Sequence, residues 1–318
     1  MPPPLDVTRA LTSWTLDVPV LCVVLALGAA YLTGARRLRQ SGEAWPWRRA
    51  AAFCGGGLGA LVLATMSFLG VYDQVLFSVR AAQTVLLLLV VPLFLTLGRP
   101  LTLLGAAVPR AGRRVERVLA SRAARILTFP ALTAFVLVVM PFLLYFTPWY
   151  EAGLSSAVVG DLTRFTLTLP GLVFFWTLLR VDPVPKAYPY VVSLWVSGVE
   201  VIGDAVLGLA VLADPNLIAG AYYHALARPW GPSVRADQVI GGGVLWILGD
   251  IVGVPFFAAQ LIQMMREDEQ EAVLVDAELD ALTPPVAGRP PAQGPGPAQQ
   301  PWWQSDPRFT GRFRGSSG

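Results

Sequence analysis

The sequence predicts an all-α membrane protein, a polytopic bundle of seven transmembrane helices. Of its 318 residues, 54% are hydrophobic and only 14% are charged, and the mean hydropathy is +0.56. Such a composition excludes an ordinary water-soluble globular protein. Apolar windows of about 20 residues, the length that crosses a hydrocarbon core about 30 Å thick, recur along the chain. Basic residues gather in alternate links between these windows.

The apolar windows are separated by clusters of Arg, Pro, Gly or Asp, which mark their ends. The first window is the shortest. It does not resemble a secretory signal peptide, because Asp6 and Arg9 cancel and three prolines stand where a basic amino-terminal region is expected. The seven predicted spans lie near residues 18–35, 49–70, 79–98, 127–147, 162–180, 189–212 and 239–263.

The positions of the cations predict the orientation of the bundle. The links at 35–48, 99–126 and 181–188, their flanks and the chain after residue 265 hold most of the Lys and Arg. By the positive-inside rule these parts are cytoplasmic, so the amino terminus is outside. An odd number of spans preserves this separation, which favours seven. All but five of the 24 cations lie on the predicted inner side, the others being Arg9, Arg80, Arg164, Arg228 and Arg235.

Three regions follow from this reading. Residues 1–17 are expected to be an extracytoplasmic amino terminus, and 18–265 the transmembrane domain. Residues 266–318 are expected to be a cytoplasmic extension of the last helix, followed after 282 by a disordered tail, because Pro, Gly, Gln and Ser dominate there. The high ratio of Arg to Lys, with abundant Ala, Gly and Pro, indicates a GC-rich bacterial source, so the plasma membrane is the predicted location.

The net charge of +3 does not indicate a nucleic-acid partner, because the excess Arg lies on the predicted cytoplasmic side of the membrane, where part of it faces anionic lipid. The stretch 110–125 has apolar residues at helical spacing and predicts a short helix on the cytoplasmic face. It is read either as a positive-inside link or as a docking surface. Cys22 and Cys54 fall inside predicted spans and are interpreted as apolar filler.

Ionisable residues inside the predicted spans are the informative ones. No hydrolase, zinc-protease or phosphate-loop motif is present. Glu200 and Asp204, four residues apart, share one face of the sixth span, and Asp250 lies near the centre of the seventh. A carboxylate at that depth costs at least about 2.5–3.5 kcal/mol. We therefore expect all three to point into the bundle, paired or protonated.

Cationic partners for these acids are few. Arg80 opens the third span and Arg164 opens the fifth, both near the predicted outer face. A long Arg side chain reaches deeper than its own backbone or snorkels outward to headgroups. The hypothesis is that both arginines, with Gln83 and Asp161, form an intramembrane polar cluster with Asp204 and also Glu200 and Asp250. In the alternative, both arginines simply contact outer headgroups.

Several stretches resemble the CtaG-type cytochrome c oxidase assembly factors, over roughly residues 50–265. They are QTVLLLLVVPLFLTLGRPLTLL at 83–104, PWYEAGL at 148–154, LLRVDPVP at 178–185 and, most specifically, ARPWGPSVRADQVIGGGVLWILGD at 227–250. The resemblance implies a non-enzymatic chaperone for the oxidase, which delivers copper to its copper-bearing subunits or stabilises them at the outer face. The residues that carry the family motifs are Pro92, Gly98, Pro100, Asp237, Gln238, Gly242, Trp246 and Gly249.

The chain departs from the family at the positions where histidines are usual. Guanidinium offers no lone pair to a metal, whereas imidazole suits copper. Copper handling is therefore implied by the resemblance alone, and His224, the only histidine, is a weak ligand candidate in an outer link. The positions where the family usually has histidine carry Arg80, Thr84, Gly160, Arg164 and Asp204.

The sequence also allows other classes of seven-span protein to be compared with an assembly factor. A proton-coupled transporter or channel that uses Glu200, Asp204 and Asp250 is the alternative, although inverted repeats are not detectable. A retinal protein needs a lysine in its last helix, and the only lysine, Lys186, lies in a link. An intramembrane hydrolase would need Asp204 and Asp250 as a catalytic pair, and no accompanying motif supports it.

Overall fold

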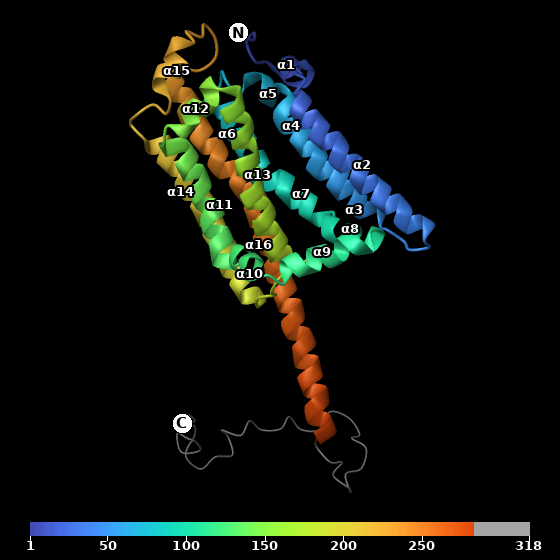
Figure 1. The fold of residues 1–318 in the computed structure, drawn as a ribbon. Helices are drawn as coiled ribbons and strands as arrows, with labels where there is room; N and C mark the ends of the chain where they lie inside the picture. Colours follow the sequence, from blue (N-terminus) through green and yellow to red (C-terminus); the bar gives the residue numbers. More distant parts are fainter. Residues whose placement is uncertain (283–318) are drawn as a thin grey trace, which may run out of the picture. The chain divides into compact units, whose positions relative to one another are not determined.

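Residues 1–282 are described by a computed structural model of the chain, and in this part the secondary structure is entirely helical (Figure 1). The tail predicted after residue 282 lies outside the described residues. Residues Met1–Met265 form one compact unit, and the chain from Arg266 on belongs to a second unit. The segments are α1 (Val7–Thr12), α2 (Val18–Gln40), α3 (Trp47–Ala50), the π-helix η1 (Ala51–Leu58), α4 (Gly59–Met66), α5 (Phe68–Tyr72), α6 (Phe77–Val85), the π-helix η2 (Leu86–Val90), α7 (Val91–Leu97), α8 (Pro100–Ala107), α9 (Pro109–Leu119), α10 (Arg122–Leu127), α11 (Pro130–Phe146), α12 (Trp149–Ser155), α13 (Ala157–Leu179), α14 (Tyr190–Ala213), α15 (Gly220–Ala225) and α16 (Val234–Leu282).

Among residues 1–282, six helical stretches are long and apolar enough to cross a membrane, and a seventh is added when α11 and α12 are taken as one bent span. These two helices meet at an angle of 67°. The break falls at Thr147, the C-cap of α11, and Pro148, the N-cap of α12, because proline cannot continue the old helix. The all-α, polytopic membrane fold is therefore confirmed. The six stretches are Val18–Gln40, Trp47–Tyr72, Phe77–Ala107, Ala157–Leu179, Tyr190–Ala213 and Val234–Glu278.

The third span changes its helical geometry around Pro92. Because proline has no N–H, a carbonyl in the preceding turn loses its usual donor, and the π-helical stretch η2 ends just before this residue. A Cβ on Gly171 of α13 would collide with the carbonyl oxygen of Leu88 and would lie 2.7 Å from Pro92 Cγ. Glycine at this position therefore lets α13 pack directly on the irregular turn.

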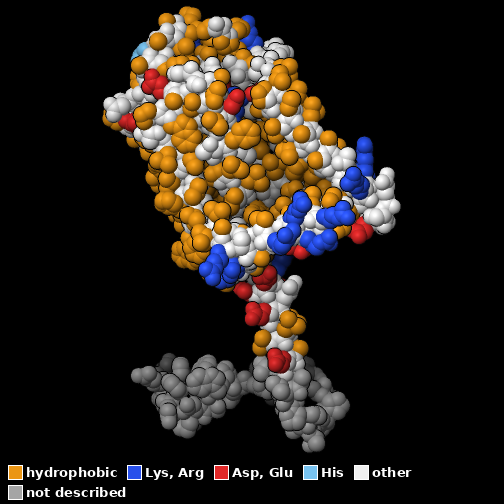
Figure 2. Space-filling view, viewed as in Figure 1, with side chains coloured by type: hydrophobic (Ala, Val, Ile, Leu, Met, Phe, Trp, Pro, Cys, Tyr) orange, Lys and Arg blue, Asp and Glu red, His pale blue; other side chains and the backbone are white. Residues whose placement is uncertain are grey.

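The basic stretch 110–125 forms two helices rather than one. α9 ends at Leu119, and Ser121 starts α10 by accepting a hydrogen bond from the backbone N–H of Ala124 at 3.1 Å. Figure 2 shows Lys and Arg side chains gathered at the end of the bundle where α9 lies, below a broad hydrophobic surface. This one-sided distribution is the pattern that predicted the orientation.

Two buried aspartates cap helices that are remote from them in sequence. Asp237 of α16 accepts hydrogen bonds from the backbone N–H groups of Phe77 and Ser78, at 2.9 and 3.2 Å, at the start of α6. Asp182 does the same for Leu101 and Thr102, at 3.1 and 2.9 Å, at the start of α8. Each carboxylate satisfies N–H groups that a helix start leaves without partners.

The other family-motif residues also have structural contacts. Gln238 accepts from the N–H of Ile218 at 2.8 Å and donates to the carbonyls of Val211 and Asn216, so it fixes the link after α14. The carbonyl of Gly98 accepts from the Tyr31 hydroxyl at 2.7 Å. Pro100 is the first residue of α8, where a missing N–H costs nothing.

The helices α14 and α16 approach each other closely through small residues. A Cβ on Gly208 would lie 2.7 Å from the carbonyl oxygen of Gly242 and also 2.7 Å from Trp246 Cβ. Asp204 lies one turn before Gly208 on α14, and a Cβ on Gly249 of α16 would lie 2.6 Å from its Oδ2 atom. This packing turns Asp204 toward α16.

Candidate functional site

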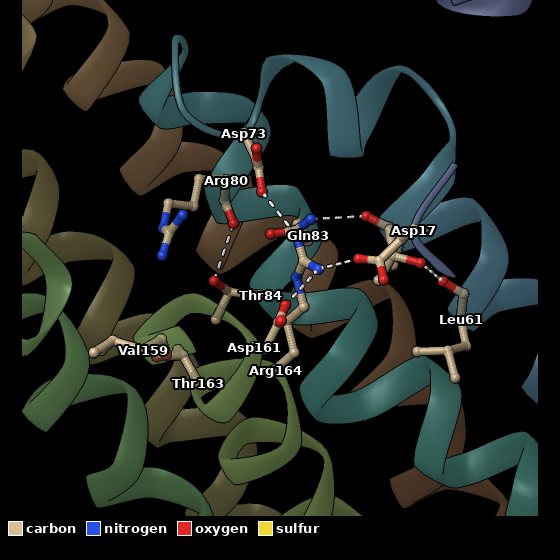
Figure 3. Close-up of polar contacts among 12 residues, drawn as sticks. Asp17, Leu61, Asp73, Arg80, Gln83, Thr84, Val159, Asp161, Thr163 and Arg164 are labelled. Atoms are coloured by element: carbon tan, nitrogen blue, oxygen red, sulfur yellow. Dashed lines mark hydrogen bonds and ion pairs between the residues drawn. The ribbon is translucent and has the colours of Figure 1, made fainter. Parts of the chain in front are cut away.

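A cavity of about 440 Å³ lies near the amino-terminal ends of α2, α6 and α13. We call it the arginine cavity and define it by its charged side chains together with Gln83. Because the starts of α2, α6 and α13 all reach this end, residues distant in sequence converge there (Figure 3). These defining residues are Asp17, Asp73, Arg80, Gln83, Asp161 and Arg164.

Arg164 joins three carboxylates at the edge of the cavity. Its guanidinium pairs with Asp17, with Asp73 at 3.6 Å and with Asp161 at 3.2 Å. Asp17 also caps α2 by accepting from the N–H of Val20 at 3.1 Å. The ion pair therefore ties the beginning of α2 to α13, while the cap fixes where α2 starts.

Arg80 differs from Arg164 because it forms no ion pair within the part of the chain that the structure describes. Its side chain is 94% buried, lines the arginine cavity and lies over the ring of Tyr150, with the guanidinium carbon 5.1 Å from the ring centre. Thr84 donates to the Arg80 carbonyl at 3.0 Å and accepts from the Tyr145 hydroxyl at 3.1 Å. Gln83 donates to the carbonyl of Ala64 at 2.8 Å. The backbone around Arg80 is thus fixed, while its charge faces the cavity.

Asp73 is the most deeply buried carboxylate of the arginine cavity and lies in the turn between α5 and α6. Burial raises the pKa of its carboxyl group above the ordinary value of 3.8, and the nearby guanidinium groups of Arg80 and Arg164 act in the opposite direction. Removal of either arginine is therefore expected to raise the pKa of Asp73 further.

The structure divides the predicted polar cluster into two parts. Arg80, Gln83, Asp161 and Arg164 line the arginine cavity. Among the described residues, no ion pair within 4 Å joins either arginine to Glu200, Asp204 or Asp250. The physical reason is the rotation of α14, whose acidic face lies against Gly249 and Gly253 of α16.

The three acids form a second polar group, which we call the acid triplet: Glu200, Asp204 and Asp250. Glu200 is 99% buried and Asp204 92% buried, and Asp250 is partly buried. A Cβ on Gly253 would lie 3.1 Å from Glu200 Oε2, which mirrors the contact between Gly249 and Asp204. The acids face protein rather than lipid, as their transfer cost demands.

Asp17 and Asp73 are partners of Arg164 that the sequence reasoning missed. Local signals for both were present. Asp17 directly precedes an apolar helix with proline at its second position, which is typical of an N-cap, and Asp73 precedes the third span by a few residues.

The donor set of the arginine cavity does not fit copper. Arginine has no lone pair to offer, and Thr84 and Gly160 supply neither imidazole nor sulfur. The three carboxylates of the cavity are all paired with Arg164. His224 lies exposed on α15 and lines a different cavity of about 270 Å³, with Arg228 and Asp237. Within residues 1–282, no group of three or more His, Cys, Asp or Glu side chains is arranged to hold a metal ion. No copper-dependent step is therefore derived from this site.

Comparison with known proteins identifies the family. Residues 29–267 match the model of the cytochrome c oxidase caa3 assembly factor family, Caa3_CtaG. An uncharacterized protein of Mycobacterium leprae is 27% identical over 289 residues, which cover 88% of this chain and 44% of that protein. Uncharacterized proteins of Mycobacterium bovis and Mycobacterium tuberculosis are each 30% identical over 292 residues, with the same coverage. The chain thus spans less than half the length of these relatives, and no solved structure matches it. The chain belongs to the cytochrome c oxidase caa3 assembly factor family.

Proposed function

We propose that this chain assists the assembly of cytochrome c oxidase in a bacterial plasma membrane, as a non-catalytic scaffold that binds a nascent oxidase subunit at its outer face. Membership of the assembly-factor family supports the role in oxidase assembly. The apolar helices support a location within a membrane. The proposed outer position of the arginine cavity follows from the positive-inside rule.

The observation that carries the proposal is the guanidinium of Arg80. It is buried, directed at the arginine cavity and without a carboxylate partner among residues 1–282, whereas Arg164 already has three. A planar guanidinium binds a carboxylate through two parallel hydrogen bonds. We therefore assign the cavity to an acidic side chain of the oxidase subunit, which would enter between α6 and α13.

We propose that the arginine cavity holds no copper ligand. Arg80 and Arg164 stand where the family usually has histidine, and they have no lone pair that could bind a metal. An ion-paired cavity of this kind orients a protein partner through charge complementarity and hydrogen bonds.

The test is complementation of a strain that lacks the gene. Expression of the unmodified chain is expected to restore assembled oxidase, measured from the haem spectrum of membranes and from oxidase activity. Arg80→Gln is expected to restore less, because removing one partner of a buried charge pair weakens binding by about 2–5 kcal/mol. Arg80→Lys is expected to be intermediate, since it keeps the charge and loses the two-pronged geometry.

The matched control is Arg9→Gln, which removes a partly exposed arginine on the same predicted side. It should complement fully, with each variant quantified in membranes by immunoblot. Normal oxidase in the deletion strain would contradict the assembly role. Recovery of oxidase in that strain by added copper alone would contradict the scaffold role and favour copper delivery.

A further inference from the structure

Unpartnered buried polar atoms are concentrated between α14 and α16. In the described part of the protein, eight buried side-chain N and O atoms have no hydrogen-bond partner, and six of them belong to these two helices. They are Ser197 Oγ, both carboxylate oxygens of Glu200, Asp250 Oδ1, and Oε1 and Nε2 of Gln260. Within a membrane no solvent from the lipid side can meet such groups, so something inside the protein must do so.

The register of the two helices places these residues in one row. Gly208 faces Gly242, Asp204 faces Gly249 and Glu200 faces Gly253, so residue numbers fall along α14 as they rise along α16. The next buried polar positions continue this row in the same direction. On α14 they are Ser197 and Ser193, and on α16 the corresponding position is Gln260.

Pairing among the side chains leaves most of the row unsatisfied. A proton shared between Glu200 and Asp204 would join those two carboxyl groups. It would leave Ser197, Gln260 and one oxygen of Asp250 without partners. α11, which also packs on α14 through Val138 against Gly203, contributes no charged residue. The missing partners must therefore come from outside this set of side chains.

The row meets a partly exposed residue at one end of the bundle and apolar side chains at the other. At the first end Ser193 accepts a hydrogen bond from Arg180 Nη2 at 2.8 Å, and Arg180 itself is only partly buried. Beyond Asp204, the buried residues of α14 are Leu207, Gly208 and Val211, so no polar side chain of α14 continues the row, and Gly208 is in tight contact with Gly242. A row closed in this way does not cross the membrane.

We infer that bound water fills a narrow polar track between α14 and α16, from Ser193 and Gln260 to Asp204, and brings protons from the Arg180 end to the acid triplet. Each water meets two to four of the orphaned donors and acceptors, as buried water does elsewhere in proteins. The positive-inside rule assigns the Arg180 end to the cytoplasm. The protein then holds a proton-accepting site that is reached from that side alone and that is separate from the arginine cavity.

Cysteine accessibility tests this inference. In a chain with Cys22→Ala and Cys54→Ala, Ser197→Cys is exposed to Ag⁺, a thiolate-binding ion small enough to follow a line of water, which is applied to either side of sealed vesicles. The free thiol that remains is then measured in detergent. The matched control is Val199→Cys, two residues away on the exposed face that meets lipid. Because the thiolate is the reactive form and lipid suppresses it, Ser197→Cys is expected to react roughly tenfold faster than the control, from the Arg180 side only.

Leu207→Cys, beyond the closed end, is expected to stay unreacted from both sides. The inference fails if Ser197→Cys reacts no faster than Val199→Cys, if it reacts from the opposite side, or if Leu207→Cys reacts. Infrared spectroscopy of the unmodified chain gives a second readout. A carboxylic C=O band that Glu200→Gln removes should shift soon after transfer to D₂O, and a Glu200 band that stays unshifted, or no such band, would overturn the proposal.

Discussion

The start of α6 depends on Asp237, a residue that is more than 150 positions away in the sequence. Its carboxylate accepts from the N–H groups of Phe77 and Ser78 and from the Ser78 hydroxyl, the last at 2.6 Å. It also pairs with Arg228 at 3.6 Å, and both partners of this pair are more than 90% buried. Replacing Asp237 with alanine removes the cap and leaves a buried guanidinium without its carboxylate.

The loss of the cap and the loss of the ion pair can be measured separately, because Asp182 caps α8 in the same way without an ion pair. Asp182 accepts from the N–H groups of Leu101 and Thr102 and from the Thr102 hydroxyl, and no ion pair to it occurs among the described residues. Loss of a cap costs up to about 2 kcal/mol. Breaking a buried ion pair costs about 3–5 kcal/mol, and we take the lower figure because Arg228 also donates to the carbonyl of Pro232.

Asp237→Ala is therefore expected to lower the free energy of unfolding by about 5 kcal/mol and Asp182→Ala by about 2 kcal/mol. The assay is SDS titration of the detergent-solubilised protein, followed by tryptophan fluorescence. The difference of about 3 kcal/mol measures the pair with Arg228. Equal losses in the two variants would refute the reasoning, because the ion pair would then contribute nothing beyond the cap.

Three further outcomes are expected. Gly249→Ala places a methyl group against Asp204 and should cost about 1–3 kcal/mol of stability in the same titration, whereas Gly243→Ala, with nothing within 4 Å of its Cβ, should cost far less. An equal effect of the two would count against the close approach of α14 and α16. For Asp73, the folded-state pKa lies above the ordinary value of 3.8, so the folded state binds the proton more tightly and stability should fall as pH rises from 3.8 through the raised pKa. Asp73→Asn should abolish that slope, and a slope that persists would assign it to another group. Arg164→Gln removes a cation that lowers the pKa of Asp73, so the same fall should extend to higher pH, as unfolding measured over a pH series would show.

Much of the fold follows from local sequence. The apolar windows determine how many helices can cross a membrane, because a lipid core admits few polar groups and demands internal backbone hydrogen bonds. Helix ends are also local: the proline at 148 breaks α11 from α12, and Asp17 caps α2. Burial of Glu200 and Asp204 could be anticipated in the same way, from transfer cost alone.

Which side chains meet was decided only by the tertiary structure. The sequence placed Arg164 and Asp204 near one another in depth, but depth does not determine the rotation of a helix about its axis. That rotation is set by packing against every neighbour at once. Here the glycines at 249 and 253 leave room for the acidic face of α14 to pack against α16. Arg164 therefore pairs with Asp17, which comes from the start of a different helix, and the acids are left to one another.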